Sequence, residues 1–167
     1  MKKWKIFFIL ILIATFIWSC EKDDICEAGT PTTPKMIVEF YDNFNPNSKK
    51  TVTDLTIVAE NSTDSLRFNG VSKIEIPLKT FADNTKYKFI INDGNPIPSL
   101  INDDFITLNY TRKDLFISRA CGFKTVFELT NPNGIVLTTD SNNWIKGIDI
   151  QQYNILNENE VHAKLFF

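Results

Sequence analysis

Apolar and polar residues alternate along most of the chain after residue 35. The pattern is clearest in "SKIEIPLK", where Ile74, Ile76 and Leu78 alternate with charged Lys73 and Glu75. Alternation over four to eight residues is typical of strands with one buried face. The same pattern predicts strands in "MIVEFYD", "TDLTIVA", "TKYKFII" and "FITLNYT".

The second half of the chain continues the alternation. The segment "DLFISRACGFKTVFELT" predicts two strands that turn near Cys121 and Gly122. The second strand presents four residues on one face: Phe123, Thr125, Phe127 and Leu129. The "NPNG" segment at 131–134 predicts a turn in which proline fixes φ and glycine takes the left-handed position. Further short strands are predicted in "IVLTT", "NWIKGIDI", "QYNIL" and "NENEVHAKLFF".

These strands predict one all-β domain at residues 35–167. Roughly eight to ten short strands in about 130 residues favour a single antiparallel β-sandwich with immunoglobulin-like topology. A closed barrel is the alternative. Pro77 indicates a sheet edge, because proline cannot donate a ladder hydrogen bond. The polar segments 60–70 and 92–104 are predicted loops, and either is a candidate binding surface.

The first nineteen residues have the layout of a secretory signal peptide. The basic "MKKWK" precedes "IFFILILIATFIW", residues 6–18, in which Thr15 is the only polar residue. This apolar run is shorter than the roughly 20 residues of a membrane-spanning helix. A basic segment followed by an apolar run of this length is typical of export signals. We therefore predict a signal peptide at residues 1–19.

The end of the apolar run resembles the bacterial lipobox. Ile17, Trp18 and Ser19 precede Cys20, although Trp18 is bulkier than the residue usual at that position. In such signals the cysteine is acylated and becomes the first residue of the mature chain, and two or three acyl chains anchor a protein stably in a membrane. The resemblance implies a lipid anchor on Cys20. An ordinary secreted domain is the alternative.

The residues after Cys20 indicate a destination. Lys22, Asp23 and Asp24 resemble the lipoprotein export signal of the Bacteroidota, which directs lipoproteins to the outer face of the outer membrane. The resemblance implies an outer-membrane protein exposed at the cell surface, with the periplasm-facing leaflet as the alternative. Residues 20–34 are then the lipidated cysteine and a polar, proline-containing linker.

The charge of the predicted mature chain disfavours nucleic acid as a partner. Loss of residues 1–19 removes three lysines and no acidic residue, which leaves 15 basic and 20 acidic residues, a net charge of −5. A net-acidic domain without a basic run is a poor ligand for phosphate backbones.

Two further cysteines, Cys26 and Cys121, lie 95 residues apart. An exported protein meets an oxidising compartment, where such a pair favours a disulfide over a metal site or a reactive thiol. Two unpaired thiols are the alternative. Zinc requires four ligands, and a chain with one histidine and no C-x-x-C motif offers no recognisable set. We predict no metal and no cofactor.

No recognisable catalytic constellation is present in the sequence. The single histidine, His162, alternates with apolar neighbours and is predicted to be a solvated strand residue. A catalytic pair of carboxylates, as in glycosidases, stays an alternative, because the two acidic residues need to be close in the fold but not in the sequence. Asp93 and the pair Asp103 and Asp104 lack the spacing of a calcium-binding loop. Trp144, the only tryptophan after residue 19, is either a core residue or an exposed sugar-binding platform.

Several blocks together resemble an uncharacterised lipoprotein family of the Bacteroidota, known only as a domain of unknown function. They are "CEKDDIC", "TPTTPKMIVEFYD", "NYTRKDLFISRACGFKTVFEL", the Trp144 region and "VHAKLFF". The resemblance implies an exported lipoprotein and supports the pairing of Cys26 with Cys121. It implies no reaction, because the family has none assigned.

The sequence therefore predicts a lipoprotein anchored in the outer membrane that acts as a non-enzymatic binding or accessory module. Its expected partners are the membrane, through the lipid on Cys20, and an envelope protein or a glycan. The alternatives are a structural subunit of an envelope complex without a small ligand, or a small glycan-active hydrolase.

Overall fold

The computed structural model describes residues 25–167. The predicted signal peptide, the acylation site Cys20 and the export signal Lys22, Asp23 and Asp24 lie outside these residues. Among the described residues, no helix has the length and apolar character needed to cross a membrane.

The described chain forms two compact units. Residues 25–30 and 116–123 form the first, which we call the disulfide unit. Residues 31–115 and 124–167 form the second, the sheet unit. Each is described by itself below.

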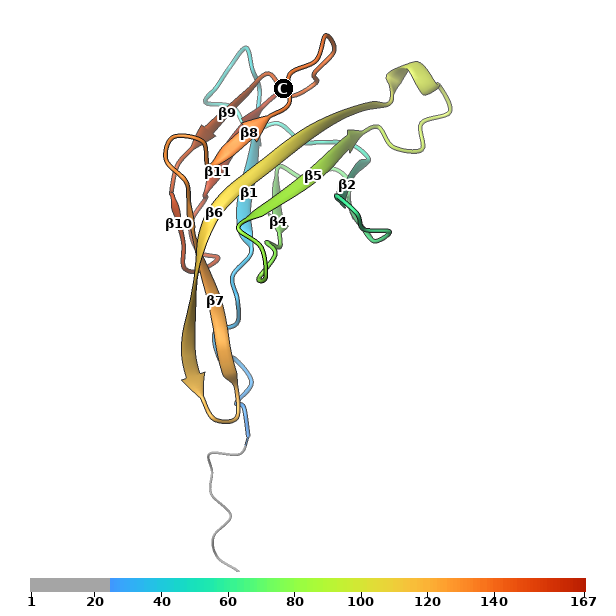
Figure 1. Ribbon diagram of the computed structural model, residues 1–167. Helices are drawn as coiled ribbons and strands as arrows, with labels where there is room; N and C mark the ends of the chain where they lie inside the picture. Colours follow the sequence, from blue (N-terminus) through green and yellow to red (C-terminus); the bar gives the residue numbers. More distant parts are fainter. Residues whose placement is uncertain (1–24) are drawn as a thin grey trace, which may run out of the picture. The chain divides into compact units, whose positions relative to one another are not determined.

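The structure is all-β apart from one turn of 3₁₀ helix, Pro98–Leu100 (Figure 1). The strands are β1 Met36–Tyr41, β2 Leu55–Ala59, β3 Ser65–Phe68, β4 Lys73–Ile76, β5 Asn84–Ile91, β6 Asn102–Ser118, β7 Gly122–Leu129, β8 Ile135–Leu137, β9 Gly147–Ile150, β10 Asn154–Ile155 and β11 Ala163–Phe166. Every segment predicted to be a strand contains strand residues, but the separate strands predicted in "FITLNYT" and at the start of "DLFISRACGFKTVFELT" are one continuous strand, β6.

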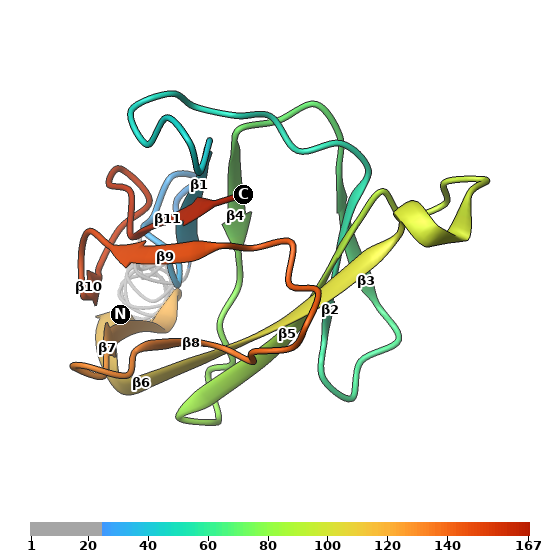
Figure 2. The same ribbon diagram turned by 90° about the horizontal axis from the view of Figure 1, so that it is seen from above.

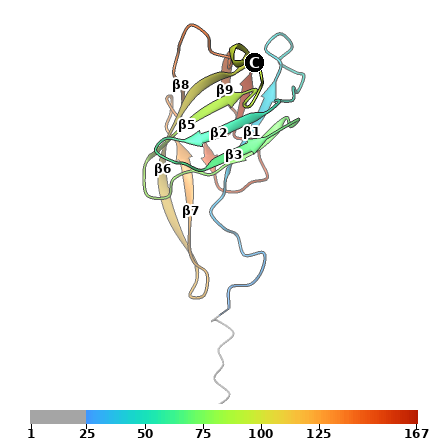
Figure 3. The ribbon, with the colours of Figure 1, turned by 90° about the vertical axis from the view of Figure 1, so that its right-hand side faces the viewer.

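The strands form two open sheets. One has four strands in the order β4-β1-β11-β9. The other has seven, in the order β10-β7-β6-β5-β2-β3, with β8 paired to β6 (Figures 1 and 3). Because neither sheet closes on itself, the closed barrel is wrong. The expectation of a purely antiparallel fold is wrong at one pair: β1 and β11 run parallel, with Val38 opposite Ala163. Parallel neighbours need a long connection, and here most of the chain lies between the two strands.

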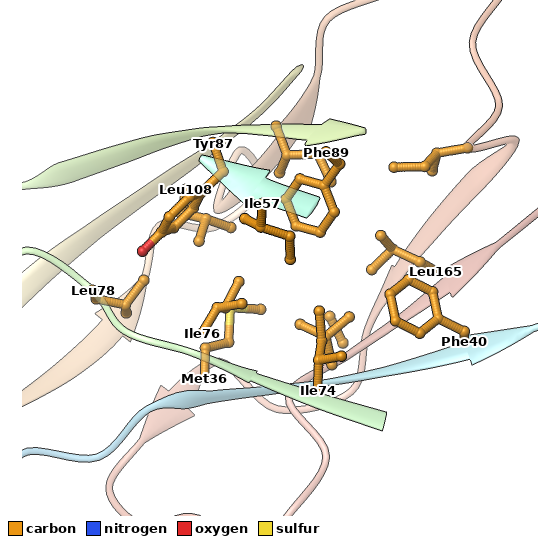
Figure 4. Close-up of a cluster of buried hydrophobic side chains, with 14 of the residues drawn as sticks. Met36, Phe40, Ile57, Ile74, Ile76, Leu78, Tyr87, Phe89, Leu108 and Leu165 are labelled. Carbon is orange, nitrogen blue, oxygen red and sulfur yellow. The ribbon is translucent and has the colours of Figure 1, made fainter. Parts of the chain in front are cut away.

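The two sheets face each other in the sheet unit (Figure 2), and one apolar core lies between them (Figure 4). The predicted inward faces supply it, because alternate side chains of a strand point to the same side. The four-stranded sheet contributes Met36, Phe40, Ile74, Ile76 and Leu165, and the seven-stranded sheet contributes Leu55, Ile57, Tyr87, Phe89 and Leu108. Leu78, which follows β4, is also buried.

Some boundaries and faces differ from the prediction. The strand β3 lies within the predicted loop 60–70, and β6 begins at Asn102 within the predicted loop 92–104. Of the four residues predicted to share one face of β7, Thr125, Phe127 and Leu129 are buried, whereas Phe123 is exposed. The turn at 131–134 is present.

Gly134 was predicted to be left-handed, and its φ lies outside that region. Glycine is required for another reason: a Cβ there would lie 2.8 Å from the Cβ of Leu129 and 2.8 Å from the carbonyl oxygen of Thr130. The backbone of the turn packs closely against the end of β7, so no side chain fits.

Candidate functional site: the edge strand β3

The strand β3 is the most exposed strand of the seven-stranded sheet. It nevertheless carries apolar residues on the face that points towards the core. It pairs with β2 on one side, with Leu66 opposite Ile57 and Arg67 opposite Thr56. It ends the sheet, so its other backbone edge has no strand partner among the described residues (Figure 3). Ser65 to Arg67 are all exposed. An unpaired edge is a template for pairing with another chain.

An apolar groove lies on the inner side of β3. Its floor is made by Leu66 and Phe68 of β3, with Ile74 of β4 and Pro77. Its volume is about 480 Å³. The groove forms where both sheets end, because β3 and β4 are each the last strand of their sheet. The position of β4 also confirms the edge that Pro77 predicted. Leu66 is 37 % exposed to solvent.

Charged side chains line the groove beside its apolar floor. They are Lys35, Lys73 and Glu75. Lys35 and Glu75 form an ion pair with 3.2 Å between Nζ and Oε2. Lys73 lies opposite Glu39 in the β1–β4 register. Burial raises the pKa of Glu39, but hydrogen bonds from Lys49 and Tyr41 and the charges of Lys49 and Lys73 outweigh burial and lower it.

A smaller polar pocket lies on the other side of β3. It has a volume of about 150 Å³, and its polar lining residues are Asp54, Thr56, Arg67, Asn69 and Asp93. The Thr56 hydroxyl donates to Asp93 Oδ2 at 2.6 Å, and Arg67 Nη2 lies 3.8 Å from the same oxygen. The Asp54 amide donates to Asn69 Oδ1 at 3.3 Å. Two carboxylates and one guanidinium give this pocket a net negative charge.

Two residues beside the polar pocket have left-handed backbone conformations. Asp54 has a φ of +46° and Asn92, next to Asp93, has a φ of +56°. Apart from glycine, aspartate and asparagine adopt this region most readily, and they do so in turns. The Asp93 amide donates to the Asp54 carbonyl oxygen at 2.9 Å, which holds the two loops together.

Trp144, the residue predicted as either a core residue or a sugar platform, lies in the core. Its side chain is buried, with 8 % exposed. The indole N–H donates to the Phe89 carbonyl oxygen at 3.1 Å, and the ring packs edge-on against Phe167. It therefore offers no exposed aromatic surface to a sugar.

His162 is buried as well, and the prediction of a solvated residue is wrong. Its Nδ1 accepts a hydrogen bond from the Ile37 amide at 2.9 Å, and its own amide donates to the Ile37 carbonyl oxygen at 3.0 Å. Burial lowers the pKa of the imidazole, although the charge of Glu160 raises it. A neutral imidazole can accept this bond. His162 therefore binds the backbone of Ile37 with both its side chain and its own backbone, next to the point where β1 and β11 begin to pair.

The acidic residues considered for calcium do not meet. Asp103 and Asp104 are neighbours on β6 and point to opposite faces of the sheet. Asp103 pairs with Lys88, with 2.5 Å between Oδ2 and Nζ. Asp104 is fully buried and accepts hydrogen bonds from the Ile145 amide and the Asn143 side chain. Burial raises the pKa of Asp104, while these bonds lower it.

Across residues 25–167, no three His, Cys, Asp or Glu side chains come together as a candidate metal site. Asp104 instead accepts hydrogen bonds from Asn143 and Ile145, the two residues that flank Trp144, and so holds this segment in place.

The two cysteines of the described chain form the predicted disulfide. Cys26 and Cys121 are bonded in the disulfide unit, with their Cα atoms 4.9 Å apart. The alternative of two free thiols is wrong. The Cys121 amide donates to the Ser118 hydroxyl at 3.0 Å, and the Thr30 hydroxyl donates to the Glu27 carbonyl oxygen at 2.7 Å. These bonds close the turn after β6 and the segment after Cys26.

The predicted site residues are thus not assembled into one site, and the candidate site uses others. Leu66, Phe68 and Arg67 were placed in a loop. The signal that identifies them is a short one: two apolar residues alternate with two polar ones in "SLRF". Asp93 and Asp54 carry no sequence signal for their meeting, because they lie 39 residues apart.

A model of a protein family matches residues 54–167, more than half of the chain. The chain belongs to DUF6452, a family of unknown function. The match covers every strand from β2 to β11 and therefore includes β3 and the polar pocket. It also includes every residue that lines the groove except Lys35. No curated protein and no solved structure matches the chain.

Proposed function

We propose that the protein is a non-enzymatic binding module of the cell envelope, held in the outer membrane by a lipid on Cys20. In this proposal the domain is an immunoglobulin-like sandwich that binds an extended segment of a partner protein along β3. The observation that carries the proposal is the edge strand between an apolar groove and a polar pocket.

The geometry around β3 fits β-strand addition. An added strand gains affinity from main-chain hydrogen bonds to the unpaired edge and specificity from pockets for its alternate side chains. Leu66 and Phe68 line the pocket on one side of the strand, and Arg67 lines the pocket on the other. A bound segment would therefore carry apolar residues at every second position.

The charge of the polar pocket indicates which residues of the partner segment alternate with its apolar ones. The polar pocket holds Asp54 and Asp93 against Arg67, and Thr56 already binds Asp93. Its net negative charge favours a lysine or arginine of the partner. We therefore expect the partner segment to be extended, with apolar residues alternating with polar or basic ones.

The contacts of Asp93 in the polar pocket favour binding over hydrolysis. The pocket has a volume of about 150 Å³. Its carboxylate at Asp93 already accepts a hydrogen bond from Thr56 and lies beside Arg67. A general acid or base must instead be able to reach the proton of a substrate.

Photo-crosslinking in intact cells tests the proposal. A benzophenone amino acid replaces Leu66 in the groove, and a matched copy replaces Phe81, which is 95 % exposed in the same unit. We expect a crosslinked protein at position 66 and none at position 81, and the crosslinked peptide to show apolar residues at alternate positions.

A synthetic peptide of that segment is then titrated against the purified protein. Leu66→Glu is expected to abolish binding, because it places a charge in the apolar groove. Ser65→Glu, on the other face of the same strand, is the control. Crosslinks to a glycan, or equal crosslinking at positions 66 and 81, would contradict strand addition.

A further inference from the structure

The disulfide unit carries an apolar surface that the binding function does not use. Three of its residues are exposed: Ile25 at 77 %, Phe116 at 59 % and Phe123 at 68 %. Phe116 and Phe123 lie near the ends of β6 and β7 and pack edge-to-face, with 5.3 Å between ring centroids. Each ring therefore remains more than half exposed although it already contacts the other.

This surface lies close in the chain to the predicted acylation site. Ile25 directly precedes Cys26, and the disulfide joins Cys26 to Cys121, which lies between Phe116 and Phe123 in sequence. Cys26 lies six positions after Cys20 in the sequence. An extended chain spans at most about 3.6 Å per residue, so Cys26 lies within about 22 Å of Cys20. The disulfide holds Cys121 near the same point.

We propose that Ile25, Phe116 and Phe123 insert into the interface of the lipid bilayer that holds Cys20. The inference rests on the acylation of Cys20 in the proposed function. A diacylated Cys20 lies at the bilayer surface, and the roughly 5–8 Å headgroup layer on each side is within reach of the disulfide unit. Removing exposed aromatic surface from water is favourable, and aromatic side chains suit this boundary.

The charge of the described part of the unit agrees with a membrane contact driven by apolar surface. It contains one basic residue, Arg119, and one acidic residue, Glu27, and both are exposed. With no net charge here, attraction to anionic headgroups has no part in the contact. The contact is therefore expected with zwitterionic lipids and to persist at high salt, which screens charge–charge interactions.

A tryptophan probe tests the inference in the full-length protein. Phe123→Trp is extracted from membranes and reconstituted into phosphatidylcholine nanodiscs with or without brominated acyl chains. Phe81→Trp is the matched control, because Phe81 is 95 % exposed in the sheet unit. We expect a blue shift and a loss of the added emission with brominated chains for Phe123→Trp only, at 0.1 and at 1 M salt alike.

The aromatic pair could instead only stabilise the hairpin, as cross-strand pairs do. Phe123→Trp keeps an aromatic ring, so that role would preserve folding and leave the added emission unquenched. That result would overturn the inference.

Mass spectrometry of the extracted protein separates this inference from the anchor. Acylated Cys20 without quenching refutes the membrane contact and leaves the anchor. Unacylated Cys20 refutes the anchor, and the same probe mixed with phosphatidylcholine vesicles then decides the contact: quenching supports it, and unchanged emission refutes it.

Discussion

Replacement of Trp144 tests whether this residue serves the core or a ligand. The side chain is buried, its N–H donates to the Phe89 carbonyl oxygen, and its ring packs against Phe167. Trp144→Phe removes the hydrogen bond and part of the ring, whereas Trp144→Ala removes the whole side chain. Both are expected to lower the free energy of unfolding without any effect on a surface ligand.

The magnitudes follow from these contacts. A lost hydrogen bond costs about 0.5–1.5 kcal/mol, and the missing five-membered ring adds about 1 kcal/mol of lost apolar burial. Trp144→Phe should therefore cost roughly 2 kcal/mol. A buried tryptophan replaced by alanine costs about 3–5 kcal/mol. For a domain of this size each kcal/mol lowers the melting temperature by roughly 2–4 °C.

Urea unfolding followed by far-ultraviolet circular dichroism is the assay, because Trp144 is the only tryptophan after residue 19 and its own fluorescence is lost. The midpoint should fall while the dependence on urea stays unchanged, which marks a loss of stability alone. Phe81→Ala, at a 95 % exposed position, is the control and should change stability by no more than about 0.5 kcal/mol.

One result would refute the core assignment. If Trp144→Phe unfolded at the same urea concentration as Phe81→Ala and also lost binding on a glycan array, the indole would be a ligand platform. The buried hydrogen bond to Phe89 makes this outcome incompatible with the structure.

Three further predictions follow from the same structure. Gly134→Ala should cost about 1–3 kcal/mol in urea unfolding, because the new Cβ would meet Leu129 and Thr130 at 2.8 Å, whereas at the control Gly147→Ala the nearest atom lies at 3.5 Å. His162, the only histidine, has a pKa lowered by burial, so the unfolded state binds a proton first as pH falls below about 6.5. The melting temperature should therefore drop from pH 7 to pH 5, and His162→Asn should make that drop smaller. Equal drops in the wild type and the variant would refute this role of His162. Removing the disulfide by Cys26→Ala with Cys121→Ala should lower stability by up to about 4.7 kcal/mol, because the bond closes a loop of 95 residues; a reductant should then lower the urea midpoint of the wild type but not that of the variant.

The strands of the core could be predicted from the sequence because burial repeats every second residue. Ile74 and Ile76 face the core while Lys73 is exposed, as the alternation predicts. The disulfide followed from the prediction of export, under which Cys26 and Cys121 are the two cysteines left to pair, and the structure contains that bond. In the first case the local pattern was sufficient, and in the second the number of cysteines was used together with a predicted compartment.

The pairing of the strands was not predictable in the same way. The parallel contact of β1 with β11 joins opposite ends of the domain, and alternation within a strand says nothing about its neighbour. His162 shows the consequence: its alternation with Val161 and Ala163 predicts a solvated face, but the backbone of Ile37 occupies that side. A polar residue in a strand is exposed only if no other segment covers its face.

The candidate site differs from the sheet edges at β4 and β10 in what it leaves uncovered. Proteins shield their edges with short strands, prolines or charges. The strand β10 has only two residues, and β4 is followed by Pro77. The strand β3 has Arg67 on its outer face, yet Leu66 on its inner face remains partly exposed above a groove of about 480 Å³. The facing sheet ends at β4, so among the described residues no further strand of that sheet covers Leu66. An extended partner segment paired with the free edge of β3 would place its own apolar side chains against Leu66 and the floor of the groove.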